Sequence, residues 1–292
     1  MAEHRNFTDG RTRTCGLIGN PVEHTMSPVI HNGLAAEFGH NLVYVPFRVE
    51  QDVKKAVEGA YALNILGMNV TVPHKTAVMD ALVDVEPLAA QIGAVNTLVR
   101  TEGGYKGYNT DMPGLYRAMQ TDGIEIKNAD VLILGAGGVA RAVAVLAAEK
   151  NAAKIRICNR TVEKAEAVVK EVKEHYPAAD LEALALNDYR KLSGKDWVGI
   201  QATSVGMYPN VEDVVIEEAD FYEKLKVGYD LIFNPYETRF MKLVKQAGKK
   251  ACNGLKMLLY QGVIAYELWN GCAVTEKQAE KIYAEMEKQM RK

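Results

Sequence analysis

The sequence predicts an α/β fold with two domains, an N-terminal α/β domain and a Rossmann-type domain. Short apolar runs alternate with helical patterns in the first third of the chain, and a second alternating series begins at Ala129. A glycine-rich turn joins the first strand of that second series to its helix. Such alternation is typical of a mostly parallel sheet with helices on its faces.

The first series ends in a strand pair. Its second strand leads into "YNTDMPG", after which we expect the domain boundary, with a helix from about Met112. Ser27 is expected to cap the first helix, with Pro28 at its first position. Strands are expected at 14–21, 42–49, 65–73, 94–100 and 104–111, and helices at 27–39 and 52–63.

The second series is of the same kind and ends in helices. From about Gly254 the chain carries aromatic and aliphatic residues at helical spacing. Strands are expected at 129–138, 153–160, 197–206 and 227–235, and helices at 139–151 and 161–177.

Composition limits the partners. The 292 residues have 48% apolar and 25% charged content, as in ordinary soluble proteins. A net charge of −2 gives no reason to expect nucleic acid or an anionic membrane. The polar N-terminus lacks a signal-peptide core, and no apolar run approaches the ~20 residues of a membrane span. The four cysteines show no metal-ligand spacing. We therefore expect a reduced cytoplasmic protein without a metal.

A glycine turn predicts a dinucleotide site. Gly135, Gly137 and Ala140 have the G-x-G-x-x-A spacing directly after a buried strand and at the start of a helix. Gly135 permits the tight turn, Gly137 lets the backbone approach a pyrophosphate, and Ala140 keeps the helix close to the strand. The helix N-terminus favours an anion. A purely structural strand–turn–helix is the alternative.

The end of the next strand indicates NADP. NAD-binding proteins usually carry Asp or Glu here, whereas this strand ends in Asn159, Arg160 and Thr161, followed by Lys164. A guanidinium attracts a 2′-phosphate that a carboxylate would repel. Arg160 could otherwise be a solvated charge at a helix start.

Lys75 and Asp111 are candidates for proton transfer. Lys75 follows a strand end, the usual ligand edge of an α/β sheet, and Asp111 follows another strand and could orient it. His24, His31 and His74 could equally be turn or packing residues. On its own the pair could be a surface lysine and a structural aspartate.

Polar residues accumulate in the same part of the chain. Thr25 and Ser27 offer hydroxyls near a helix start, suited to a carboxylate. Asn69, Thr71 and Asn96 are neutral groups of the kind that orient a polyhydroxylated ring, and the first two occupy alternate positions of one predicted strand. Each could separately be a turn or cap residue.

As an ordered set, nine motifs over nearly the whole chain resemble the shikimate dehydrogenase family. They are "GNPVEHTMSPVIHN", "GMNVTVPHK", "GAVNT", "NTD", "LGAGGVARA", "NRT", "ATSVGM", "FNPYET" and "NGLKMLLYQG". The resemblance implies reversible, NADPH-dependent reduction of 3-dehydroshikimate to shikimate, a late step towards chorismate and the aromatic amino acids. It also implies a substrate-binding catalytic domain (1–113 plus 254–292, the C-terminal helices returning to it) and an NADP-binding domain (114–253), with the cleft between them.

The resemblance also assigns roles to residues, with Lys75 as the general acid/base and Asp111 as its partner. Further substrate contacts would be Thr25, Ser27, Asn69, Thr71, Asn96, Phe233 and Gln261. NADP contacts would be Gly135, Ala136, Gly137, Gly138, Val139, Asn159, Arg160, Thr161, Lys164 and Thr203, with Ile232, Gly254 and Met257 around the nicotinamide.

Three departures leave the substrate range open. The family commonly has serine at Thr25, tyrosine at Phe233 and asparagine at Gln201. Because a relative also oxidises quinate, a quinate/shikimate dehydrogenase with broader substrate or NAD use is the first alternative. Another two-domain NADP reductase and a non-catalytic nucleotide-sensing module are further alternatives. A monomer and a homodimer both fit the sequence.

Overall fold

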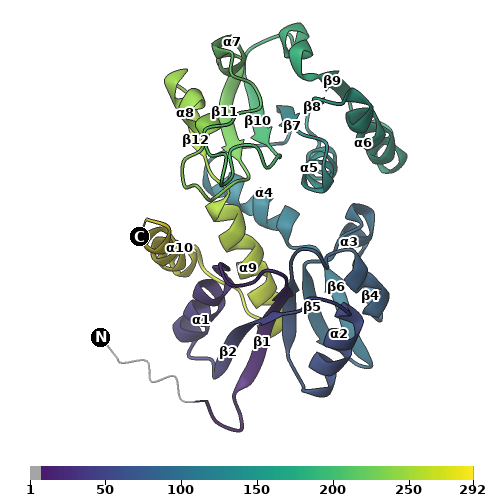
Figure 1. Ribbon diagram of the computed structural model, residues 1–292, viewed down its shortest axis with the longest axis vertical. Helices are drawn as coiled ribbons and strands as arrows, with labels where there is room; N and C mark the ends of the chain where they lie inside the picture. The colour runs from purple at the N-terminus through teal and green to yellow at the C-terminus, as the bar shows by residue number, and fades with distance from the viewer. Residues whose placement is uncertain (1–7, 292) are drawn as a thin grey trace. The chain divides into compact units, whose positions relative to one another are not determined.

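The computed structural model describes residues 8–291, which form two compact α/β units (Figure 1). The first unit runs to Leu115 and resumes at Leu258, and the second is Tyr116–Met257. The boundaries fall inside helices α4 (Asp111–Thr121) and α9 (Leu255–Asn270). The domain boundaries expected from sequence, 113/114 and 253/254, separate a substrate-binding domain from an NADP-binding domain. Because the fold does not test these binding roles, that division remains a prediction.

The first unit is built on a six-stranded mixed sheet with the order β2-β1-β3-β5-β6-β4. β1 pairs in parallel with β2 and β3, whereas β5 runs antiparallel to both β3 and β6. The strands are β1 (Arg13–Gly19), β2 (Leu42–Arg48), β3 (Gly67–Val70), β4 (Asp84–Val85), β5 (Thr97–Thr101) and β6 (Gly104–Tyr108).

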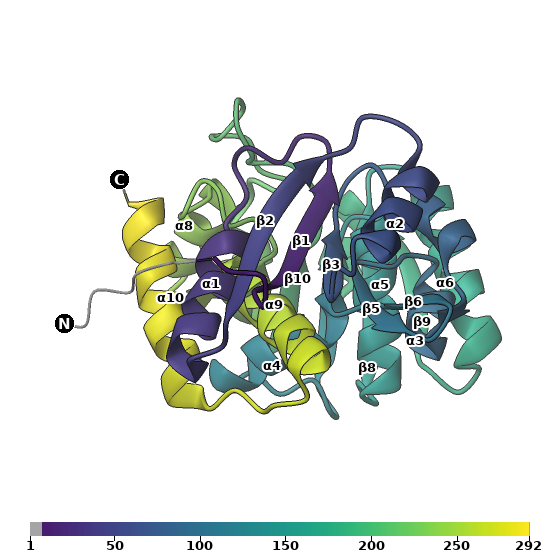
Figure 2. The same ribbon diagram turned by 90° about the horizontal axis from the view of Figure 1, so that it is seen from below.

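Helices α1 (Ser27–Phe38), α9 and α10 (Glu276–Met290) gather on one face of this sheet (Figure 2). A Cβ on Gly67 of β3 would lie 2.0 Å from Trp269 of α9, and one on Gly33 of α1 would lie 2.7 Å from Ile282 of α10. These glycines allow the close packing. Helix α2 (Val53–Ala62) buries Val53, Val57 and Ala60 with the apolar side chains of β3, and α3 (Pro87–Ile92) and the 3₁₀ turn η1 (Ala77–Ala81) complete the unit.

Two sequence expectations are corrected here. Ser27 does not cap α1: Met26 is the N-cap and Ser27 is the first helical residue, because the Ser27 hydroxyl accepts a hydrogen bond from Thr25 Oγ1 at 3.1 Å instead of a backbone N–H. The strand expected through position 73 ends at Val70, so Thr71 lies one residue beyond it, where its N–H still donates to Ile18 O.

The second unit has a parallel sheet with the order β12-β11-β10-β7-β8-β9. Numbered from its first strand this is 3-2-1-4-5-6, the Rossmann order. Its elements are β7 (Asp130–Leu134), α5 (Gly138–Glu149), β8 (Lys154–Asn159), α6 (Val162–His175), β9 (Leu181–Ala185), η2 (Leu186–Lys191), β10 (Trp197–Gln201), α7 (Ala219–Glu223), β11 (Leu225–Asp230), α8 (Arg239–Gln246) and β12 (Lys250–Cys252).

The predicted α/β fold class is confirmed by the two sheets. Between residues 8 and 291, no helix has the length and apolar character needed to cross a membrane. The cysteines are free thiols, buried at Cys15, Cys158 and Cys252 and half-buried at Cys272.

Candidate active site

A lysine–aspartate pair lies at the carboxyl end of the β3 segment in the first unit. Lys75 Nζ donates to Asp111 Oδ2 at 2.7 Å, and the two side chains are 32% and 20% exposed. The pair is thus partly shielded but open to a small molecule. Lys75 sits in the turn after β3, where its carbonyl accepts from Val95 N at 2.8 Å.

Asp111 is held by the start of α4. Asn109 accepts hydrogen bonds from Asp111 N at 3.1 Å and Met112 N at 3.4 Å, which satisfies N–H groups of the first turn. The Asn109 amide also donates to Ala94 O at 3.0 Å. The "NTD" motif therefore places the carboxylate through its asparagine.

Asn96 completes the contacts to Asp111. Its Nδ2 donates to Asp111 Oδ1 at 2.8 Å, so both carboxylate oxygens have a donor. Its Oδ1 accepts from the Thr110 N–H at 2.8 Å and from the hydroxyls of Thr110 and Thr97 at 3.1 and 3.0 Å. Within residues 8–291 its second N–H has no acceptor, which leaves that N–H for a ligand oxygen.

Other predicted substrate residues lie at different positions in the first unit. Asn69 is buried, and its Nδ2 donates to Thr97 Oγ1 at 3.1 Å. Thr71 packs directly on Gly19, because a Cβ built on Gly19 would lie 2.2 Å from Thr71 Cγ2. Gln261 is buried in α9, which crosses α4 at Gly114, one helical turn after Asp111. Lys75, Asp111 and Asn96 are directly joined. Thr25 and Ser27 hydrogen bond to each other.

The glycine turn of the second unit fits a dinucleotide pyrophosphate. Gly135 has a φ of 111°, and its N–H donates to Cys158 O at 2.8 Å. Among the described residues, nothing lies within 4 Å of a Cβ built on Gly137 or Gly138, and no side chain caps the N-terminus of α5. Space and backbone N–H groups thus coincide, as phosphate binding requires. Val139 is an apolar side chain left 49% exposed beside them.

The segment after β8 presents free positive charge. Arg160, Thr161 and Lys164 are exposed, and neither Arg160 nor Lys164 forms an ion pair within the described range 8–291. Asn159 donates to Thr161 O at 2.8 Å and fixes the turn. These side chains suit a phosphate on the ribose of a dinucleotide.

Thr203 connects the glycine turn to the next strand. A Cβ on Gly135 would lie 2.7 Å from Thr203 Cγ2, so Thr203 packs directly on the turn. Its backbone N–H and its hydroxyl donate to Gln201 Oε1 at 2.6 and 2.7 Å. The buried Gln201 is thus an organising residue at the end of β10.

A buried carboxylate organises the end of β11. Asp230 accepts from Ile232 N at 2.9 Å, from Thr238 Oγ1 at 2.5 Å and from Gln201 Nε2 at 3.3 Å. Burial raises the pKa of Asp230 from 3.8 to about 6, because the charged form loses its hydration. Ile232 O accepts from Gly254 N at 3.0 Å, so these two predicted nicotinamide neighbours lie together.

Two further predicted residues lie in the second unit. Phe233 and Met257 are half-buried members of the second unit.

Several supporting residues of the site were not predicted from sequence: Thr97, Thr110, Tyr44, Asn109 and Asp230. The asparagine and threonine of "AVNT" and "YNTD" were available as a signal, since these residue types bond to nearby backbone and side chains.

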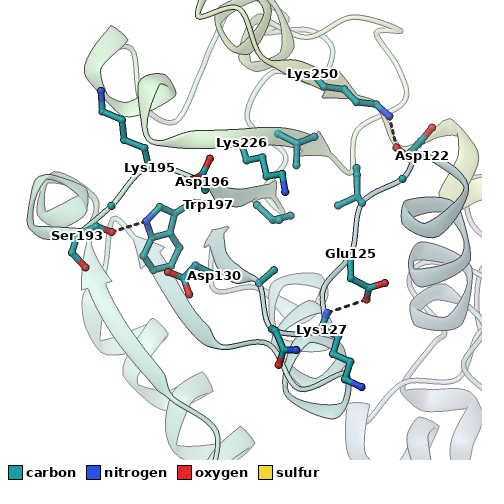
Figure 3. Close-up of a pocket in the computed structure, with 17 residues that line it drawn as sticks. Asp122, Glu125, Lys127, Asp130, Ser193, Lys195, Asp196, Trp197, Lys226 and Lys250 are labelled. Atoms are coloured by element: carbon teal, nitrogen blue, oxygen red, sulfur yellow. Dashed lines mark hydrogen bonds between the residues drawn. The ribbon is translucent and has the colours of Figure 1, made fainter.

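A pocket of about 740 Å³ lies at the amino ends of strands β7, β10 and β11 of the second sheet, away from the glycine turn at the carboxyl end of β7 (Figure 3). Lys195, Lys226, Asp130 and Asp196 line it with mixed charge. The chemistry predicted from sequence lies at the carboxyl ends, so this pocket is not the candidate site. In residues 8–291 no cluster of three His, Cys, Asp or Glu side chains could hold a metal ion.

The Rossmann sheet with its glycine turn defines a dinucleotide-binding protein with an additional α/β unit. Residues 17–98 match the shikimate dehydrogenase substrate binding domain, residues 117–205 match shikimate / quinate 5-dehydrogenase, and residues 254–281 match the shikimate 5'-dehydrogenase C-terminal domain. The chain belongs to the shikimate dehydrogenase family.

Individual relatives are similar to this chain over almost their full length. Shikimate dehydrogenase (NADP(+)) of Desulforamulus reducens is 44% identical over 269 residues, covering 90% of this chain and 91% of its own. A crystal structure of shikimate dehydrogenase in complex with NADP+ has a TM-score of 0.85 at 38% identity, covering 96% and 97%. The Listeria monocytogenes enzyme in complex with shikimate and NAD also has a TM-score of 0.85, at 32% identity, covering 94% and 97%.

Proposed function

We propose that the chain interconverts shikimate and 3-dehydroshikimate with NADP as cofactor, in the biosynthesis of chorismate and the aromatic amino acids. The observation that carries this proposal is the Lys75–Asp111 contact of 2.7 Å, with Asn96 donating to the second carboxylate oxygen at 2.8 Å. The names of the relatives support the substrate and the cofactor.

Lys75 is the proton carrier in this proposal. In the oxidising direction the neutral Nζ accepts the proton of the reacting hydroxyl, and in the reducing direction the ammonium donates a proton to the carbonyl oxygen. NADP, when bound, supplies the hydride acceptor or donor. Asp111 holds the Lys75 side chain, and the free Asn96 N–H orients a ring hydroxyl.

The cofactor site follows from the second unit. The open backbone at Gly137 and Gly138 would receive the pyrophosphate, and the exposed Arg160 and Lys164 would attract the 2′-phosphate of NADP. Ile232, Gly254 and Met257 would border the nicotinamide. A carboxylate at the position of Arg160 would have favoured NAD instead.

Quinate is the second candidate substrate, because Thr25 narrows the predicted carboxylate site and Phe233 lacks a phenolic donor. Both acids should be assayed with NADP+ and with NAD+ by following the absorbance of the reduced cofactor. We expect the highest kcat/KM with shikimate and NADP+. Higher values with quinate would favour the broader enzyme, and no turnover with either acid despite NADPH binding would favour a non-catalytic module.

A further inference from the structure

A chain of hydrogen bonds runs through the first unit from Tyr44 to Asp111. Tyr44 OH donates to Asn69 Oδ1 at 2.8 Å, and Asn69 Nδ2 donates to Thr97 Oγ1 at 3.1 Å. Thr97 Oγ1 donates to Asn96 Oδ1 at 3.0 Å, and Asn96 Nδ2 donates to Asp111 Oδ1 at 2.8 Å. The chain therefore ends on the carboxylate that holds Lys75.

Asp111 sets the orientation of the Asn96 amide at the end of this chain. The Asp111 carboxylate, paired with Lys75, only accepts, so Asn96 must turn its Nδ2 towards it and its Oδ1 towards Thr97. Asn96 Oδ1 also accepts from the N–H and the hydroxyl of Thr110, whose Oγ1 lies 3.1 Å from Thr97 Oγ1. With its proton on Asn96 Oδ1, the Thr97 hydroxyl accepts from Asn69. A reversed Asn96 amide would bring its carbonyl oxygen against the carboxylate.

Sheet register brings these residues together. Asn69 of β3 lies directly opposite Thr97 of β5, so both side chains project from the same face. Tyr44, Asn69, Asn96 and Thr97 are each at most 4% exposed. Bulk water has little access at such depth, so each bond constrains the next.

The side-chain amide of Asn69 takes part in this chain through both of its N–H groups. One N–H of its Nδ2 is used by Thr97 Oγ1, and the other points to Asn96 O at 3.4 Å. Behind it, the His31 ring stacks on Tyr44 with a centroid separation of 4.2 Å and keeps the phenol in place. The substrate contact predicted for Asn69 from sequence stays a prediction, and in the structure its N–H groups face Thr97 and Asn96.

We propose that Thr97, Asn69 and Tyr44 are positioning residues that fix the Asn96 amide against Asp111 and thereby align Lys75. This inference rests on the proposed function, since it assigns a purpose to the alignment of the Lys75–Asp111 pair. It makes Thr97 the central link, because its single hydroxyl serves both amides.

The kinetic test uses Thr97→Val, which keeps the side-chain shape and removes the hydroxyl. We expect kcat for shikimate oxidation to fall about tenfold, with the Kd for NADP+ changed by less than about twofold, and Thr97→Ser to restore the rate. Tyr44→Phe, at the far end, should cause a smaller loss. An unchanged kcat in Thr97→Val would overturn the proposal.

A matched control separates positioning from stability. Tyr105 is another fully buried tyrosine of the same sheet, and its hydroxyl donates to Ile65 O at 2.6 Å, outside the chain of bonds. Tyr105→Phe should lower Tm without lowering kcat. A similar fall of kcat in Tyr105→Phe and Tyr44→Phe would show a general packing effect and contradict the proposal.

A second measurement does not depend on turnover. With ¹⁵N-labelled asparagine, hydrogen exchange of the Asn96 side-chain amide should be slow in the wild type, faster in Thr97→Val and unchanged in Tyr105→Phe. If the wild type fails to oxidise shikimate, the proposed function fails while this measurement still tests the positioning. Equal exchange in wild type and Thr97→Val would refute the positioning itself.

Discussion

The buried carboxylate of Asp230 makes the stability of the protein depend on pH. The pKa of Asp230 is about 6 in the folded protein and 3.8 in the unfolded chain. As pH rises, the unfolded chain therefore loses this proton at a lower pH than the folded protein does. The contribution of the Asp230 carboxyl group to the free energy of unfolding is therefore fully present below about pH 4. It declines by about 3 kcal/mol as pH rises through 6.

Asp230→Asn removes this titration while preserving the shape of the side chain. We expect the stability of the variant relative to the wild type to rise between about pH 4 and pH 7.5, measured by chemical denaturation at both values. Glu166→Gln changes an exposed carboxylate of α6 and serves as the control. A relative stability of Asp230→Asn that stays constant with pH would contradict the burial argument.

Arg160 tests the choice of cofactor at a single exposed side chain. Arg160→Ala should raise the KM for NADPH roughly 10–100-fold, because a charge-assisted hydrogen bond to the 2′-phosphate is lost, and should leave the KM for NADH nearly unchanged. Lys170→Ala on the exposed face of α6 is the control for charge alone. Equal losses with both cofactors would show that Arg160 does not contact the 2′-phosphate.

At the scale of elements, the turn between β7 and α5 depends on one glycine. Gly135 has a φ of 111°, and a Cβ there would lie 2.7 Å from Thr203 Cγ2 and 3.0 Å from Ala202 O. Gly135→Ala should lower the free energy of unfolding by about 1–3 kcal/mol and weaken NADP+ binding, measured by denaturation and by titration.

The matched control for this substitution is Gly59→Ala in the exposed part of α2. A Cβ at Gly59 meets nothing within 4 Å in the part of the chain that the structure describes, so alanine should stabilise that helix by roughly 0.5–1 kcal/mol. A Gly135→Ala variant as stable as Gly59→Ala, with unaltered affinity for NADP+, would contradict the strain argument.

The elements with long apolar patterns were predictable from sequence, and the short ones were not. β9 (Leu181–Ala185) and β12 (Lys250–Cys252) add strands at the two edges of the second sheet, where few residues are needed and no pattern marks them. The capping role expected of Ser27 was wrong because Thr25, two residues earlier, occupies its hydroxyl. Local propensity does not include such competition.

The candidate site shows the same division. Lys75 and Asp111 could be selected because strand ends of an α/β sheet meet at one edge. The supporting Thr97 and Tyr44 could not, because their contact with Asn69 depends on how β1 pairs with β2 and β3 and how β3 pairs with β5. Each of these pairings joins segments separated by at least one helix. Register across a sheet is a tertiary property.

At the scale of the whole molecule, each unit has its own sheet and supplies different chemistry. The first unit carries the Lys75–Asp111 pair, and the second carries the glycine turn and the exposed Arg160. In the proposed reaction the first unit moves the proton and the second holds the hydride carrier. Loss of Lys75 should therefore strongly lower turnover without loss of cofactor binding.

The most direct test of this account is the rate of shikimate oxidation with NADP+ in the wild type and in Lys75→Ala. We predict turnover by the wild type, a kcat lowered ~10²–10⁴-fold in the variant, a smaller change in KM, and an unchanged Kd for NADP+. A Lys75→Ala variant with the kcat of the wild type would contradict the assignment of Lys75 as the general acid/base.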